Sequence, residues 1–175
     1  NATGTGTLSS EINARTTGAS AGTLLTGGTI QGTALSLSGT VTTIAGAPSG
    51  STTSGDTDGT GTDARFNNPY GMTTDGTYLY VVEYGNHKIR KIKLSSGEVT
   101  TLVGPSAGCS SSCSGDTDGT GNSARFNGPF GMTTDGTNLY VADVNNNKIR
   151  KIVISTGVVT TIAGPAEGTT TSGDT

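Results

Sequence analysis

Two aspartate-rich stretches contain the residues whose types and spacing come nearest to a metal site. The first includes Asp56, Asp58 and Asp63, and the second includes Asp116 and Asp118. Carboxylates two residues apart among glycines can bring oxygen ligands to one calcium ion. The usual calcium-loop pattern is not met, because its third acidic position and its closing glutamate are missing. We therefore expect these aspartates to form turns and to accept backbone hydrogen bonds, with calcium as the less favoured alternative and no other cofactor.

His87 is the only histidine of the chain and lies in the stretch "GNHKIRKI". The corresponding stretch in the second half reads "NNNKIRKI", so that Asn147 replaces His87 while Asn146 matches Asn86. Structural zinc normally takes four Cys or His ligands, and the chain has no repeated Ser/His/Asp arrangement. We interpret His87 as a turn residue that tolerates positive φ. Because loops on rigid scaffolds often carry function, these four turn positions are also our candidates for an interaction face.

Most positive charges fall in two short runs that alternate with isoleucine. The chain has a net charge of −3, whereas binding to a nucleic acid backbone needs clustered positive charge. We expect no nucleic acid partner, and we interpret the runs as a structural stripe on the outer part of each repeat, with Glu83 and Asp143 as acidic partners. The runs contain Lys88, Arg90, Lys91 and Lys93, and then Lys148, Arg150 and Lys151.

Cys109 and Cys113 lie in the loop "GCSSSCSG", which is two residues longer than the corresponding loops. Two cysteines that arrive with an insertion favour a local disulfide, and a disulfide implies an oxidising compartment. A metal pair or redox-active thiols are the alternative, although the spacing is not that of a CxxC motif. We expect an extracellular or cell-surface protein. No apolar run approaches the length that spans a bilayer, so we expect no membrane span.

An internal repeat decides the fold. Ser54–Gly104 aligns without gaps with Ser114–Gly164 at a constant offset of 60, and 35 of the 51 aligned positions are identical. Each copy divides into four runs rich in β-branched and aromatic residues, separated by turns with Gly, Asn or Asp. In the first copy the predicted strands are Tyr70–Thr74, Tyr78–Tyr84, Lys88–Ser95 and Val99–Val103. Four antiparallel strands repeated in tandem are typical of β-propeller blades, so we predict an all-β fold.

The stretch "RFNNPYGMTTDGTYLYVVEYG" followed by "NHKIRKI" resembles an NHL repeat. The resemblance covers both full copies and implies propeller blades, in which Phe66 and Phe126 wedge between neighbours and Arg65 and Arg125 bind a carboxylate or carbonyl group. Some NHL propellers are metal-dependent lyases with several histidines, and others bind RNA on a positive face. With one histidine and an acidic balance, this chain departs from both.

The repeat also predicts how the chain is organised. Residues 1–33 form a Gly/Thr-rich segment that supplies complementing strands or a linker. Residues 34–53 resemble the outer hairpin of an earlier blade, 54–113 and 114–171 are two NHL blades with their following loops, and 172–175 begin a further repeat. Propellers have about 4–8 blades, so these blades do not close a ring alone. We expect either a piece of a longer chain or a subunit that associates with its own copies.

The sequence favours a non-enzymatic extracellular structural or interaction module within a larger surface or adhesive protein. Its expected partners are itself or further repeats of the same chain, and a protein or a glycan ligand. One alternative is a self-assembling subunit of an extracellular filament or an oligomeric propeller. A second alternative is a hydrolase or lyase on a propeller face, which needs converging ligands that the sequence does not supply.

Overall fold

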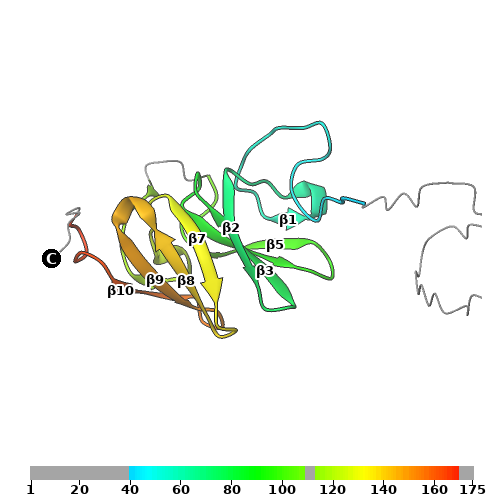
Figure 1. Ribbon diagram of the computed structural model, residues 1–175. Coiled ribbons are helices and arrows are strands. Elements are labelled where there is room, and N and C mark those ends of the chain that lie inside the picture. Colours follow the sequence, from blue (N-terminus) through cyan, green and yellow to red (C-terminus); the bar gives the residue numbers. More distant parts are fainter. Residues whose placement is uncertain (1–39, 109–112, 170–175) are drawn as a thin grey trace, which may run out of the picture. The chain divides into compact units, whose positions relative to one another are not determined.

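The computed structural model describes residues 40–108 and 113–169, which form one compact unit (Figure 1). The predicted segments 1–33 and 172–175 lie outside the described residues, as does Cys109. The unit contains two five-stranded antiparallel sheets, one from each copy of the repeat. This confirms the all-β fold class and the blade architecture. We call the two sheets blade 1 and blade 2.

Blade 1 has the strand order β1-β5-β4-β3-β2. Its strands are β1 (Gly59–Thr60), β2 (Pro69–Thr74), β3 (Tyr78–Glu83), β4 (Lys88–Lys93) and β5 (Glu98–Val103), with a 3-10 turn η1 at Gly61–Asp63. Blade 2 repeats this order as β6-β10-β9-β8-β7. Its strands are β6 (Gly119–Thr120), β7 (Pro129–Thr134), β8 (Asn138–Asp143), β9 (Lys148–Val153) and β10 (Val158–Ala163), with 3-10 turns η3 (Gly121–Ser123) and η4 (Val144–Asn146).

The four predicted strands of each repeat are present, and their turns adopt the expected conformations. Gly76 between β2 and β3 has φ +90° and Gly97 between β4 and β5 has φ +70°. His87 has φ +55°, so the prediction of positive φ is confirmed. The short strand β1 was not predicted from the sequence. It adds to the edge of the sheet through the antiparallel pair Gly59 and Val99, and two residues are too few to produce an alternating pattern.

The two blades pack face to face around one apolar core. We call the side of blade 1 that meets blade 2 its rear face, and the opposing side of blade 2 its front face. The rear face of blade 1 contributes Tyr80, Val82, Ile89 and Val103, and the front face of blade 2 contributes Ala124, Phe126, Leu139, Val141, Ile152 and Val159. Phe126 has no exposed surface in this seam, which confirms that the repeated phenylalanine wedges between blades.

The front face of blade 1 repeats the front face of blade 2 at an offset of 60. It consists of Ala64, Val81, Ile92 and Val99, with Phe66, Leu79 and Ala45 packed against them. Residues 40–53 contain no strand, so the described part of the predicted hairpin at 34–53 is not formed. Gly46 nevertheless donates its N–H to the Gly61 carbonyl at 3.0 Å, as Gly104 does to Gly121 at 3.1 Å. Ile44–Gly46 therefore occupy the place of an earlier blade's last strand.

Candidate functional site

Arg90 on β4 is the centre of a buried ion network in blade 1. Its Nη1 donates to Glu83 Oε2 at 2.8 Å and its Nη2 donates to Asp58 Oδ1 at 2.7 Å. The same two nitrogens donate to the carbonyl oxygens of Arg65 and Thr57 at 3.0 Å. The guanidinium also lies 5.1 Å from the centre of the Phe66 ring. The network fastens the loop before β2 onto the front of the sheet.

Blade 2 contains the same network at an offset of 60. Arg150 binds Asp143 at 2.8 Å and Asp118 at 2.9 Å, and its guanidinium lies 5.0 Å from the centre of the Phe126 ring. Burial raises the pKa of the Asp143 carboxyl, against hydrogen bonds from Asn127, Asn146 and Arg150 that lower it. Because both blades repeat these contacts, we infer that the network holds the loop before the first long strand against the sheet of each blade.

The predicted outer stripe of basic residues is therefore wrong for four of its seven members, Lys88, Arg90, Lys148 and Arg150. Lys88 and Arg90 have no exposed surface, and Arg150 has none either. These side chains project inward and bind aspartates of the preceding loop, for example Lys88 to Asp56 at 3.3 Å. A charge that leaves water needs such a partner, which explains why each inward cation faces a carboxylate. The predicted acidic partners Glu83 and Asp143 are confirmed by their contacts with these arginines.

The five aspartates proposed as calcium ligands are not brought together. Asp56, Asp58, Asp116 and Asp118 each bind a lysine or an arginine. Asp63 lies at the exposed end of η1. Within residues 40–108 and 113–169, no group of three or more Asp, Glu, His or Cys side chains is placed to hold a metal ion. The Asp-Gly pattern builds ion pairs in each blade instead of a ligand shell.

The two candidate asparagines Asn86 and Asn146 point into the protein and away from the loop face. The Asn86 amide donates to Glu83 Oε1 at 2.9 Å and to the Gly55 carbonyl at 2.8 Å. Asn146 donates to Asp143 at 2.8 Å and to Gly115 at 2.7 Å. They complete the hydrogen bonding of a buried carboxylate, which otherwise carries a desolvation cost.

His87 lies in the seam between the blades. Its Nδ1 accepts a hydrogen bond from the backbone N–H of Gly128 in blade 2 at 3.0 Å. The side chain is nearly buried, and desolvation lowers the pKa of the imidazole, although the Asp143 carboxylate partly opposes this. The corresponding Asn147 of blade 2 is exposed. The histidine is thus a contact between repeats.

The predicted disulfide joins Cys113 to a residue outside the described part of the chain, Cys109. It stays a prediction, which a mass measurement with and without reductant tests.

Exposed aromatic rings form a surface that the sequence reasoning missed. Tyr70 on β2 and Phe130 on β7 have ring centres 4.5 Å apart, and 49% of Tyr70 and 47% of Phe130 remain exposed. Tyr84 packs edge-on against Tyr70 at 5.7 Å, and the Asn145 amide donates to the Tyr84 hydroxyl at 3.4 Å. We call these four residues the aromatic surface. The only sequence signal for it was the repeated "P-(Y/F)-G".

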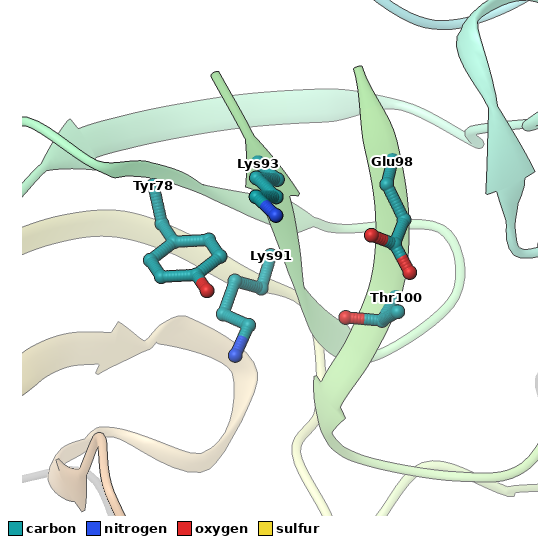
Figure 2. A pocket seen from close by; sticks show the side chains of 5 residues that line it. All are labelled: Tyr78, Lys91, Lys93, Glu98 and Thr100. Atoms are coloured by element: carbon teal, nitrogen blue, oxygen red, sulfur yellow. The ribbon is translucent and has the colours of Figure 1, made fainter. Parts of the chain in front are cut away.

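A separate pocket lies on the rear side of blade 1, away from the aromatic surface. Figure 2 shows its five side chains, which come from β3, β4 and β5: Tyr78, Lys91, Lys93, Glu98 and Thr100. The Lys91 ammonium lies 4.4 Å from the centre of the Tyr78 ring. In blade 2 three of these positions are Asn138, Val153 and Val158, so the pocket is not repeated.

Two tandem four-stranded blades, each closed at its edge by a short fifth strand, define a β-propeller repeat protein. No family model matches the chain. It is 38% identical over 109 residues to NHL repeat-containing protein 2 of Bos taurus and 34% identical over 116 residues to that of Homo sapiens. The matches cover 60% and 62% of this chain but only 14% and 15% of those relatives. Together with the fold, they confirm the resemblance to NHL repeats that the sequence predicted.

A solved structure shares the same fold. An auxiliary nutrient binding protein from Bacteroides ovatus superimposes with a TM-score of 0.51 and 24% identity, over 64% of this chain and 27% of that chain. The likeness supports the propeller architecture. Among the described residues, we find no helix that is long and apolar enough to cross a membrane.

Proposed function

We propose that this chain is a non-enzymatic interaction module of a larger extracellular or cell-surface protein, and that its aromatic surface binds a protein ligand. The observation that carries the proposal is the pair Tyr70 and Phe130. Both rings are about half exposed, although they stack on each other from neighbouring inner strands. Large aromatic side chains on a rigid framework contribute contact area at low entropic cost, and they are enriched where proteins bind one another.

The ion networks support a structural role for the acidic and basic groups. The carboxylates of Glu83 and Asp143 are buried against Arg90 and Arg150 and cannot reach a substrate. Structural ion pairs shift pKa values as catalytic sites do, so the raised pKa of the Glu83 carboxyl, caused by burial, does not by itself indicate catalysis. The same network in both blades favours a fastening over an active site.

An extracellular location is supported by composition alone. The chain is low in charge, and its two cysteines lie close together in one inserted loop. Such a pair suits an oxidising compartment.

Photo-crosslinking tests the proposed ligand surface. A photoreactive phenylalanine analogue is placed at Tyr70 or Phe130 in the full chain, and at Thr137 on an exposed hairpin tip as the control. The three proteins are exposed to a cell-surface protein fraction. We expect one or a few discrete crosslinked proteins from positions 70 and 130, absent at 137 and displaced by unmodified chain. Equal crosslinking at all three positions, or displacement by free oligosaccharide, contradicts a specific protein ligand.

A further inference from the structure

The seam between the two blades shows how one repeat packs on the next. In this seam Ile89 and Val103 of the rear face of blade 1 have no exposed surface, because Phe126 and Leu139 of the front face of blade 2 cover them. His87 adds a hydrogen bond to Gly128. Every residue of the seam has a counterpart 60 positions away. The exposure of these counterparts can therefore be compared with that of the seam residues.

The rear face of blade 2 is the corresponding surface, and nothing among residues 40–108 and 113–169 covers it. Ile149, the counterpart of Ile89, is 40% exposed, and Ile162 is 51% exposed. Ala163, the counterpart of the buried Val103, is exposed as well. A shallow hollow of about 310 Å³ lies there, lined by Ala142, Val144, Asn147, Lys148, Ile149, Ala163 and Gly164.

The front face of blade 1 is open in a complementary way. Met72 is 59% exposed and Leu94 is 40% exposed, whereas their blade 2 counterparts Met132 and Ile154 are partly buried in the seam. Phe66 is half-buried, whereas Phe126 is fully buried. Each end of the module therefore presents one half of the interface that its middle has already formed.

One segment shows that the two open faces fit each other. The sequence "VTTIAG" occurs twice, at Val41–Gly46 and at Val159–Gly164. The first copy covers part of the front of blade 1, where Ala45 packs against the apolar cluster and Gly46 donates to the Gly61 carbonyl. In the second copy Ile162, Ala163 and Gly164 are exposed at the rear face of blade 2. The front of blade 1 thus already binds the Ala-Gly end of a sequence that blade 2 also carries.

We propose that the rear face of blade 2 docks on the front face of blade 1 of a second copy of this chain. Ile162, Ala163 and Gly164 of one copy take the place that Ile44, Ala45 and Gly46 hold in the other, and Ile149 becomes covered as Ile89 is. Asn147 comes to face the backbone N–H of Asn68, as His87 faces Gly128. Asn68 has φ 49° and Gly128 has φ 58°. The backbone N–H of Asn68 therefore lies in the same local backbone conformation as that of Gly128.

The contact joins two different surfaces, so it is head-to-tail and leaves a free face at each end. Such heterologous contacts form rings when the rotation closes and filaments when it does not. The inference goes beyond the proposed ligand binding, because its occupant is a second copy of this chain and its argument rests on the two apolar faces.

Two charged variants of the full chain test the docking by mass measurement in solution. Ile149→Lys places a charge on the rear face of blade 2, and Met72→Glu places a charge on the front face of blade 1. Both side chains are exposed, so the fold tolerates the changes. We expect the unmodified chain to form dimers and larger species as its concentration rises towards about 1 mM, above the Kd of weak specific interfaces. Each variant alone weakens association by about tenfold or more, because a charge is buried in an apolar seam.

An equimolar mixture of the two variants is the decisive sample. Each variant keeps the face that the other lacks, so the mixture forms a dimer that does not grow further. Thr137→Lys, which adds a charge at a hairpin tip, associates like the unmodified chain. An unmodified chain that stays monomeric, or a mixture that stays monomeric, overturns the proposal. Because the readout is self-association, its failure leaves the crosslinking result at Tyr70 unaffected.

Discussion

The imidazole Nδ1 of His87 accepts a hydrogen bond from the backbone N–H of Gly128 at 3.0 Å, and so connects blade 1 to blade 2. Because Nδ1 is the acceptor, the neutral ring carries its proton on Nε2. A protonated imidazole has an N–H at both nitrogens, and its Nδ1 proton then opposes the Gly128 donor. The only histidine of the chain is therefore a pH-sensitive contact between repeats.

We predict that the free energy of unfolding falls as the pH drops below about 6.5, the ordinary pKa of histidine. Desolvation lowers the pKa of His87 in the folded chain, despite the attraction of Asp143, so the unfolded chain binds the proton first. The stabilising contribution is complete above the unfolded pKa. It is lost progressively as the pH falls from there to the lower folded pKa. Denaturant unfolding between pH 7.5 and about 5 measures this slope.

The control is His87→Asn, which installs the residue that blade 2 has at this position, Asn147. Asparagine tolerates the positive φ of the turn and does not titrate. The variant has a flatter stability profile between about pH 5 and 6.5, while the titration of carboxylates at lower pH is unchanged. Equal slopes for both proteins mean that His87 does not carry the effect.

Glu83→Gln is predicted to lower the free energy of unfolding by about 3 kcal/mol, because Arg90 keeps its charge but loses its buried partner. Neither side chain of the pair has exposed surface. This loss of stability is at the low end of the range for breaking a buried ion pair, because Asp58 still binds Arg90 at 2.7 Å. Denaturant unfolding measures it against Glu98→Gln on the exposed side of β5, which changes stability by less than about 0.5 kcal/mol. Similar losses in the two variants contradict a network specific to Arg90.

The strands and turns could be predicted because the repeat shows the same pattern twice. The Asp-Gly turn at Gly76 and the turn at His87 recur at an offset of 60, and turn residues have local causes in φ and side-chain size. The seam could also be foreseen, since a phenylalanine recurs at Phe66 and Phe126 where blades meet. These features depend on residues close together in the chain or on comparison of the copies.

The inward direction of Lys88 and Arg90 could not be predicted. Arg90 meets Asp58 across 32 residues, and a basic run gives no sign of which side chains face a distant loop. The aromatic surface was missed for a similar reason. Tyr70 and Phe130 come together only because β2 lies beside β7, and that contact follows from the packing of whole blades.

Calcium is predicted to leave the melting temperature unchanged. Asp58 accepts from Arg90 and from both the N–H and the hydroxyl of Thr101, so its oxygens are already satisfied. Asp58→Asn lowers stability by about 1 kcal/mol, discounted because the carboxylate is partly exposed to solvent. Thermal unfolding in several millimolar calcium, and again in chelator, measures both effects. A calcium-dependent rise in melting temperature that Asp58→Asn abolishes restores the calcium site.

Gly71 and Gly131 occupy the same position on the innermost strands of the two blades, but in the part of the chain that the structure describes only Gly71 has a blade packed over it. A Cβ at Gly71 lies 2.5 Å from the Phe130 carbonyl oxygen and 3.1 Å from the Gly131 Cα, so β2 and β7 must separate. A Cβ at Gly131 meets nothing within 4 Å. Gly71→Ala is therefore predicted to destabilise the chain by about 1–3 kcal/mol, whereas Gly131→Ala changes stability by less than about 0.5 kcal/mol.

Gly131→Ala separates folding from docking. In the head-to-tail complex Gly131 of one copy takes the place of Gly71 in the seam, against the β2 backbone of the next copy. The variant is expected to fold with unchanged stability and to associate about tenfold more weakly, by the same backbone clash that destabilises Gly71→Ala. Denaturant unfolding and sedimentation of the same sample measure the two properties. Full association of Gly131→Ala places the contact between copies elsewhere than on the open rear face of blade 2.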